Sequence, residues 1–527
     1  MDKKFLIAVL MSLGTVWLFN HMMRRNAVEV SQGGVVDVAA QRDLTPGQPV
    51  QVPTTEVVYK PLVTTVAFSD QPAADVREIT VETPLVQAVF SQAGGTLTSL
   101  AFKEHLGKGK KPLTTLALTP EKGGHGAFLV GFEQAAPLAY QFVAKNKLAE
   151  GTQVVFKGEN DHAIVRKTFI LRDASYQCDM VLEVEPKHSD KGVTPRILFP
   201  APYVQEIADD TISVCSWDEQ KESLDTYEPA GVRSSAWFWV GGKPLFGAQD
   251  RYFAHAVVAD QQSFVQRGYI RVDSAQAVTS ILEGPRITKK AVWHLSFYLG
   301  PKTQDSLHAV DERLPQLLSF GFLNPICKFL LKLLAYFYEL LGNFGLAIIV
   351  MTIALRLPFT PLTIYAKKQA DIFARYQPTI NRIQMKYRHD KATQHQELMR
   401  FYQEHNLTPQ MQLAGCFPQL IQMPILFALF RVLNNYVDLY QAPFGGWIFD
   451  LSARDPYYLL PLLLCLSMLL LNRQNPMQDE KQRVIMIFFS ILVSAVFATF
   501  SAGLVLYWLV GNLISVGEDY LRKAFFK

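Results

Sequence analysis

The stretch "GLAIIVMTIALRLPFTPLTIYAKKQ", residues 345–369, has the composition of a membrane-spanning helix but contains an arginine, Arg356. No Asp or Glu lies within ten positions of Arg356 on either side. A charged side chain at the centre of a bilayer costs about 2.5–3.5 kcal/mol on insertion scales, so such residues usually face a polar interior. The stretch therefore predicts a membrane protein with a polar site around Arg356.

Polar side chains recur on the helix face that carries Arg356. Thr352, Arg356, Thr360 and Thr363 are 4, 4 and 3 positions apart, a spacing that places them on one side of a helix. The nearest acid in the predicted helices, Glu518, comes at the end of the last one. We therefore expect Arg356 to stand in water as an unpaired cation that awaits an anion. The alternative is that Arg356 snorkels to the cytoplasmic interface.

Other predicted helices carry polar residues that would complete this interior, or that serve helix packing instead. They are Gln419, Gln422, Ser490, Ser494, Tyr507, Gly511, Asn512 and Ser515.

The composition divides the 527 residues into two parts. Hydrophobic residues make up 49% and charged residues 19%, and nearly everything after residue 322 is hydrophobic or basic. We therefore expect one large water-exposed domain and a membrane part. The five cysteines show no metal-binding spacing. Cys178 and Cys215 either form a disulfide or remain free thiols. No nucleotide-binding, metalloprotease or esterase motif occurs, so we predict no enzyme, no metal and no cofactor.

The water-exposed part has the pattern of an antiparallel β-sandwich. In "YQCDMVLEVE" (176–185), apolar and mostly polar residues alternate as in a half-buried strand. Further strands are expected in "REITVETPLVQAVFS", "TQVVFKGE", "FVQRGYIRVD" and "VWHLSFYLG", and a turn at Gly94-Gly95. The predicted organisation is an uncleaved signal anchor (1–25), a flexible linker (26–56), the sandwich (57–315), an amphipathic interfacial helix (316–342) and a membrane core (343–527).

Five spans are predicted in the core, at about 344–365, 415–437, 457–471, 484–500 and 503–519. With the anchor they make six. Residues 366–414 hold eight cations and four acids, whereas loop 438–456 holds three acids and one cation. The positive-inside rule then predicts that both termini are cytoplasmic and that the sandwich is outside.

The basic segment 366–412 is expected to form a cytoplasmic helical hairpin. Its apolar stripe is Ile372, Tyr376, Ile380, Ile383 and Tyr387. Its cations would dock on an anionic membrane surface or a ribosome, without direct nucleic-acid readout. They are Lys367, Lys368, Arg375, Arg382, Lys386 and Arg388.

Three segments resemble the YidC/Oxa/Alb membrane protein insertases: "GCFPQLIQMPILFALFRVL" (415–433), "YQAPFGGWIFDLSARDPYYLLPLL" (440–463) and "SAGLVLYWLVGNLIS" (501–515). "VETPLVQAVFSQAGGTLTSL" (81–100) resembles the periplasmic domain of Gram-negative members. The resemblance implies a multi-pass α-helical protein of the bacterial inner membrane, with six spans, a five-helix insertase core and a large periplasmic all-β sandwich domain.

The same resemblance implies a hydrophilic groove that opens to the cytoplasm and to lipid and is closed to the outside. Arg356 falls at the position of the family's groove arginine. The other residues implied at or near the groove are Thr352, Gln419, Gln422, Tyr507 and Trp508. Trp508 departs from the second tyrosine that many relatives carry. The implied partners are nascent membrane proteins, the Sec translocon, the ribosome and the signal-recognition receptor.

Two other functions compete with this interpretation. A channel or solute transporter with a central charged site would be expected to carry inverted repeats, and the sequence shows no such symmetry. The sandwich as a glycan-binding or glycan-processing module is the other, but no pair of catalytic carboxylates is evident from the sequence.

Overall fold

The computed structural model describes residues 77–106, 111–115, 126–132, 138–188, 192–202, 212–228, 236–239, 244–272, 278–318, 323–407, 417–474 and 480–525. The chain divides into two compact units, residues 1–318 and 319–527, and each is considered by itself. The predicted signal anchor, the linker and the first twenty residues of the predicted sandwich lie outside the described residues.

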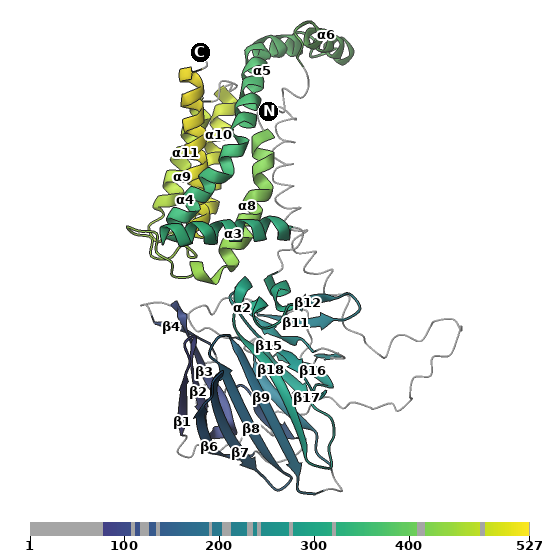
Figure 1. The fold of residues 1–527 in the computed structure, drawn as a ribbon. Helices are drawn as coiled ribbons and strands as arrows, with labels where there is room; N and C mark the ends of the chain where they lie inside the picture. Colours follow the sequence, from purple (N-terminus) through teal and green to yellow (C-terminus); the bar gives the residue numbers. More distant parts are fainter. Residues whose placement is uncertain are drawn as a thin grey trace, which may run out of the picture. The chain divides into compact units, whose positions relative to one another are not determined.

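Antiparallel strands build the first unit (Figure 1). Four form the sheet β1-β2-β3-β4, with bounds Glu78–Glu82, Val86–Ser91, Thr96–Leu106 and Pro112–Thr115. Five form β13-β16-β17-β10-β5, with bounds Ala236–Trp239, Arg267–Val272, Val278–Glu283, Pro195–Pro200 and Leu129–Phe132.

Nine strands form the large sheet, in the order β12-β11-β14-β15-β18-β9-β8-β7-β6. Their bounds, in that order, are Ser223–Tyr227, Ser213–Asp218, Phe246–Gln249, Phe253–Asp260, Ala291–Pro301, Gln177–Pro186, Ala163–Arg172, Gly151–Glu159 and Ala139–Lys147.

The alternation predicted in residues 176–185 is confirmed in β9. Cys178, Met180, Leu182 and Val184 are buried on one face of the large sheet. The single strand expected in residues 77–91 is instead two, β1 and β2. Pro84 lacks the backbone N–H that a continuous ladder needs, and the turn is closed by Thr83.

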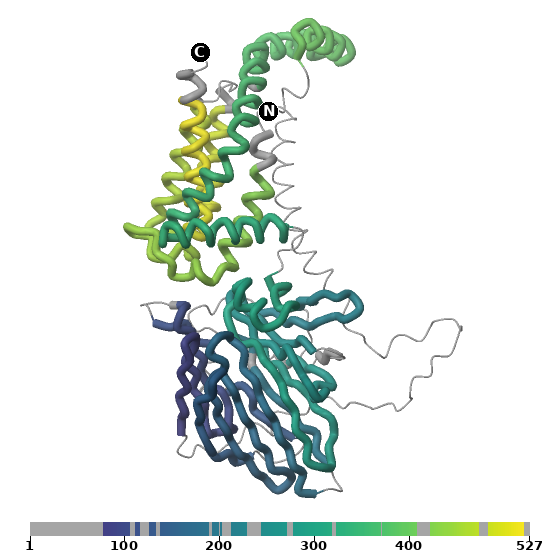
Figure 2. The backbone as a smooth tube through the Cα atoms, in the orientation of Figure 1, coloured from purple at the N-terminus to yellow at the C-terminus, as the bar shows by residue number. Residues whose placement is uncertain are grey.

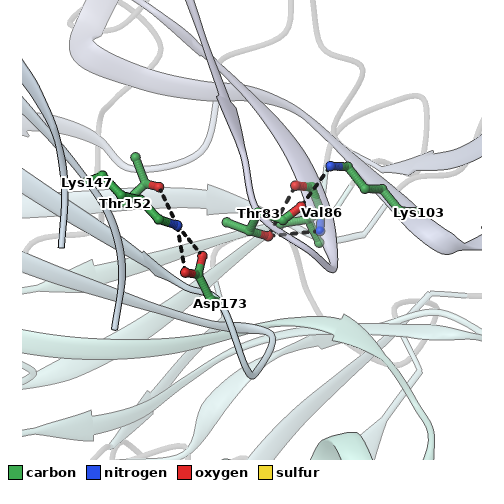
Figure 3. Close-up of polar contacts among 6 residues, drawn as sticks. All are labelled: Thr83, Val86, Lys103, Lys147, Thr152 and Asp173. Carbon is green, nitrogen blue, oxygen red and sulfur yellow. Dashed lines mark hydrogen bonds and ion pairs between the residues drawn. The ribbon is translucent and has the colours of Figure 1, made fainter. Parts of the chain in front are cut away.

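Side-chain hydrogen bonds stabilise two turns of this unit (Figure 3). The Thr83 hydroxyl accepts a hydrogen bond from the Val86 N–H, and the Lys103 ammonium donates to the Thr83 carbonyl at 2.8 Å. Lys147 on β6 forms an ion pair of 2.6 Å with Asp173, in the turn after β8. These contacts tie the ends of neighbouring strands together.

Aromatic rings join the two smaller sheets to the large one. Phe90 of β2 lies 5.2 Å from Phe169 of β8, and Phe199 of β10 lies 5.7 Å from Phe297 of β18 (centroid distances). Both smaller sheets therefore pack on the large sheet, which is the sandwich predicted from the sequence.

One core position of the sandwich holds a lysine. Lys167 of β8 is fully buried, and its ammonium donates to the carbonyls of Gly94 and Phe128. It also lies 4.2 Å from the centroid of the Tyr140 ring. Burial lowers the pKa of Lys167 well below its usual value, because the charged form loses its water. Lys167 therefore links the segments that carry Gly94, Phe128 and Tyr140, and the free-energy cost is the loss of water around its ammonium.

Cys178 and Cys215 are buried free thiols. Burial raises the pKa of Cys215 to about 12, so the thiol stays protonated. The alternative of a disulfide between them is not what the structure shows.

Helices build the second unit, and Figure 2 follows their backbone. They are α3 (Asn324–Leu341), α4 (Phe344–Arg356), η9 (Leu357–Phe359), α5 (Thr360–Lys386), α6 (Lys391–Glu404), α8 (Phe417–Asn435), α9 (Leu459–Gln474), α10 (Glu480–Phe497) and α11 (Ala502–Phe525). In the bundle, α11 packs against α9, α4 and α8, and α10 packs against α9.

The amphipathic helix α3 starts eight residues later than the predicted 316. Residues 314–318 form a short 3-10 helix that belongs to the first unit instead. Pro325 lies in the first turn of α3, where its missing N–H costs nothing, and Gly342 ends the helix in a left-handed conformation. Cys327, Leu330 and Leu334 are buried, whereas Phe329, Tyr336 and Leu340 are exposed. The helix therefore packs on the bundle and leaves a second apolar face uncovered.

The predicted boundary at 365/366, between the first core span and the hairpin, falls inside a helix. Helix α5 runs unbroken from Thr360 to Lys386 across it. The break comes earlier, at the 3-10 turn 357–359, because Pro358 and Pro361 each remove a backbone donor there. Among the described residues, the helical run Phe344–Lys386 is the one long and apolar enough to cross a membrane, and Leu459–Arg473 and Arg483–Phe497 are shorter apolar helices.

Within the predicted hairpin, 366–412, the structure describes the second part of α5, up to Lys386, and the whole of α6. Asp390 caps α6 by accepting from the N–H groups of Ala392 and Thr393. Tyr376 packs on Phe401 at 6.0 Å between centroids. The predicted stripe needs one correction. Ile372 is exposed and Phe373 is buried in its place, because the larger ring reaches Tyr402 on α6.

Candidate functional site: a polar cluster between helices

Arg356 is the last residue of α4 and reaches across to α11. Its Nη1 donates a hydrogen bond of 2.7 Å to the hydroxyl of Ser515. Its guanidinium lies over Gly511, where an added Cβ would come within 2.8 Å of Nη2. Its Nε is buried without a hydrogen-bond partner among the described residues. The guanidinium is therefore half-buried and hydrogen-bonded to a hydroxyl, and its expected exposure to water remains a prediction.

A carboxylate lies closer to Arg356 than the sequence suggests. Glu518 is one turn after Ser515 on α11, and its Oε1 accepts from the Thr360 hydroxyl at 2.9 Å. Ser515, one turn earlier on the same helix, is the residue that binds Arg356. Glu518 is also within 3.8 Å of the Lys367 ammonium, which pairs with Asp519 at 2.9 Å.

We call these residues the Arg356 cluster: Arg356, Thr360, Lys367, Ser515, Glu518 and Asp519. The cluster contains two cations and two carboxylates, so the charges balance. Neither Lys367 nor Glu518 is among the residues predicted to line the site together with Arg356. Their signal in the sequence is faint, because 151 residues separate them and neither lies within an apolar run.

A second polar contact joins α8 to α11. The Gln422 amide donates to the Tyr507 hydroxyl, and the Tyr507 side chain is buried. Tyr507 precedes Gly511 by one helical turn, so this contact and Arg356 lie on the same side of α11. The side chain of Gln419, also predicted at the site, lies outside the described residues.

Two predicted site residues of α11 face other helices. Asn512 donates to the Ser467 hydroxyl of α9 at 3.0 Å, and the Trp508 ring packs edge-on against Phe497 of α10. A further contact joins Asn472 of α9 to Ser490 of α10 at 2.8 Å. Ser467 and Asn472 were not predicted, although each is a polar residue in an apolar run. These contacts place Asn512 and Trp508 in the α9–α10 side of the bundle, away from Arg356.

The predicted threonine stripe is only partly at the cluster. Thr352 is fully buried, and its hydroxyl donates to the carbonyl of Ile348 in its own helix. Thr363 likewise donates to its own helix, at Phe359. Thr360 is the member of the stripe that reaches α11. On the opposite face, Leu346 and Ile353 are exposed, as expected of a lipid-facing surface.

The predicted docking cations of the hairpin fall into two groups. Lys367 is turned towards α11 and belongs to the Arg356 cluster. The remaining five are exposed on α5 and the turn after it: Lys368, Arg375, Arg382, Lys386 and Arg388.

At the other end of the bundle, the loop between α8 and α9 is tightly hydrogen-bonded. Asp455 is buried and accepts from the N–H groups of Tyr457 and Leu460 and from the indole of Trp447. Ala502 at the start of α11 donates to the Ala453 carbonyl at 2.7 Å. Phe444 packs on Gly345, where a Cβ would clash with its ring. The loop thus covers this end of α4 and α11.

These features define a membrane protein class: an apolar helical bundle with a charged polar cluster between its helices, joined to a large β-sandwich. Two family models match the chain. The model described as "YidC periplasmic domain" matches residues 78–333, and the model described as "60Kd inner membrane protein" matches residues 336–527. The chain belongs to the YidC/Oxa/Alb family, in its bacterial form with a periplasmic domain.

Several curated relatives are similar along nearly the whole chain. A protein of Geobacter metallireducens named "Membrane protein insertase YidC" is 29% identical over 99% of both chains. One of Citrifermentans bemidjiense with the same name is 33% identical over 52% of both chains. The solved structure of an active YidC insertase is 18% identical, covering 86% of this chain and 94% of that chain, with a TM-score of 0.39.

Proposed function

We propose that this chain is a membrane protein insertase of the bacterial inner membrane, which receives the polar tail of a client protein at the Arg356 cluster. The observation that carries the proposal is a half-buried guanidinium between the helices of an apolar bundle. Ser515 binds it, and its buried Nε has no partner among the described residues. Family membership supports the same conclusion, because the relatives are named insertases.

The energetics of the bilayer explain why such a cluster is useful. A polar tail cannot cross about 30 Å of hydrocarbon unaided. A hydrated polar groove along α4, α8 and α11 would shorten that path, and Arg356 would attract an anionic tail part-way. The apolar segment of the client then moves into lipid, where burial contributes about 25 cal/mol per Å² of apolar surface. No nucleotide hydrolysis by this chain is required.

The hairpin is proposed as the cytoplasmic docking element. Five exposed cations give it a surface that suits an anionic membrane or a ribosome. The Sec translocon and the signal-recognition receptor are proposed as further partners on the family resemblance. Both termini are proposed to be cytoplasmic, from the distribution of cations among the loops.

Replacement of Arg356 by Ala, Lys or Glu tests the proposal. The purified variants are reconstituted in liposomes, and protease protection measures insertion of single-span clients whose tails are acidic, neutral or basic. We expect Lys to retain most of the insertion activity, and Glu to reduce insertion of acidic-tailed clients most. Arg454→Ala, an exposed arginine outside the Arg356 cluster, is the control and should behave like wild type.

Two results would contradict the proposal. If all three variants insert every client as well as wild type does, Arg356 has no electrostatic role. If the wild-type liposomes insert no client but conduct small ions, the chain is a channel or transporter.

A further inference from the structure

We propose that Glu518 is a resident anion of the Arg356 cluster, and that it sets how strongly the protein prefers acidic client tails. This inference rests on the proposed insertase function and deepens it. It assigns a specificity-determining role to the carboxylate of Glu518, in the cluster where the sequence suggested only the uncompensated positive charge of Arg356.

The position of Glu518 is the first observation. Its carboxylate is more than nine-tenths buried, at the α11 turn that also carries Ser515. Ser515 binds Arg356, and Glu518 accepts from Thr360, which follows the break after α4. One turn of α11 therefore presents a hydroxyl and a carboxylate to the junction between α4 and α5.

The incomplete pairing of Glu518 is the second observation. One oxygen, Oε1, is held by Thr360, whereas Oε2 is buried and accepts no hydrogen bond from the described residues. The nearest cation to Oε2 is Lys367, at 3.8 Å, and Lys367 has its closer contact with Asp519 at 2.9 Å. Glu518 thus has hydrogen-bonding capacity that the cluster does not use, and Arg356 has an unused Nε.

The charge balance then determines what a client tail meets. With Glu518 ionised, Arg356 and Lys367 are offset by Glu518 and Asp519, and the cluster has no net positive charge. A client carboxylate that approaches Arg356 also meets the like charge of Glu518, held by Thr360 on the neighbouring turn, whereas a neutral polar tail does not. Lys367 works in the opposite direction, because its ammonium, 3.8 Å from Oε2 of Glu518, offsets that negative charge.

The test uses two variants whose effects should be opposite in sign. Glu518→Gln keeps the side-chain shape and an oxygen that can accept from Thr360, but it removes the charge. Lys367→Gln removes the cation that shares Glu518. Each full-length variant is reconstituted in liposomes, and insertion is measured for two clients that differ only in their tails, one with Asp residues and the other with Asn at the same positions.

We expect Glu518→Gln to raise the ratio of acidic-tail to neutral-tail insertion by roughly fivefold, as about 1 kcal/mol for a partly buried charge interaction implies. Lys367→Gln should lower the same ratio. Asp519→Asn is the matched control. Asp519 is as buried as Glu518 and lies on the same turn, but its described ion pair is with Lys367. This variant should therefore change the ratio less than Glu518→Gln does. A purely structural role would change insertion of both clients together and leave their ratio unaltered.

The outcomes separate this inference from the function on which it rests. If wild type inserts the neutral-tail client and the ratio is unchanged or lower in Glu518→Gln, the inference is overturned and the insertase function stands. A ratio that rises in Lys367→Gln would also overturn it. If wild type inserts neither client, the insertase function fails and the inference fails with it.

Discussion

At the scale of the residue, the environment of Arg356 depends on side chains about 160 positions away. The helical spacing of Thr352, Arg356 and Thr360 predicted a polar face, and Arg356 and Thr360 do face α11. The identity of the partners was not predictable from that spacing. A hydroxyl and a carboxylate of α11 complete the cluster, and Thr352 satisfies its own hydroxyl within α4. The sequence could not supply these partners, because one helix face does not reveal which surface of another helix packs on it.

Gly511 gives a test at this scale. A Cβ at this position would lie 2.8 Å from Arg356 Nη2, closer than real Cβ contacts allow, so Gly511→Ala should push the guanidinium away from Ser515. Because the obstacle is the end of a flexible side chain, and because Ala favours helix by about 1 kcal/mol over Gly, the fold should remain stable. We expect insertion of acidic-tailed clients to fall several-fold with an unchanged thermal unfolding temperature in detergent.

The same helix offers a matched control for this substitution. A Cβ added at Gly517 would meet no neighbouring side chain or segment within 4 Å, so Gly517→Ala brings the same gain in helix propensity without the contact. Equal insertion by the two variants would contradict the positioning role of Gly511.

At the scale of the element, proline positions decided where helices break. Pro358 and Pro361 interrupt the helix directly after Arg356, so α4 and α5 meet at the Arg356 cluster. Pro378 lies inside α5 without ending it. Proline content alone therefore did not predict the boundaries, because the cost of a missing hydrogen bond depends on what the rest of the helix packs against.

The loop between α8 and α9 gives a test at the scale of the element. Asp455 accepts three hydrogen bonds, one from the Leu460 N–H in the first turn of α9, one from the Tyr457 N–H before it and one from the Trp447 indole. Removing a side chain that caps a helix N-terminus lowers the free energy of unfolding by about 0.5–2 kcal/mol. Here the Trp447 indole also loses its acceptor. We expect Asp455→Ala to lower the thermal unfolding temperature and to expose the loop to protease in detergent.

Arg454→Ala, at the neighbouring exposed residue, is the control for that measurement. An Asp455→Ala protein as stable and as protease-resistant as this control would show that the loop does not depend on the Asp455 hydrogen bonds.

At the scale of the whole molecule, the two units use different physical means of burial. The sandwich excludes water with facing aromatic rings, and it tolerates the buried Lys167 because two carbonyls and a tyrosine ring surround its ammonium. The helical unit leaves large apolar side chains exposed along its helices, such as Leu462, Phe488 and Ile491. Exposed apolar surface of this extent suits lipid rather than water.

The orientation in the membrane is testable at this scale. The cation distribution predicts that the hairpin is cytoplasmic and that the loop between α8 and α9 is periplasmic. In a variant without its five native cysteines, Phe449→Cys in that loop should react with a membrane-impermeant maleimide in spheroplasts, because Phe449 is 68% exposed. Lys391→Cys, at the start of α6, should react only after lysis. The reverse labelling pattern would refute the predicted topology.

By itself, the sequence determined the division into a β-rich unit and an apolar helical unit, the alternation of β9 and the family. These are properties of short windows of chain, since hydropathy, period-two burial and motifs are read from neighbouring residues. Only the tertiary structure decided that Glu518 and Lys367 share a cluster with Arg356, that Trp508 and Asn512 face other helices, and that the cluster is charge-balanced. The physical reason is that helix packing brings together charges more than 150 positions apart, and no local pattern records which faces meet.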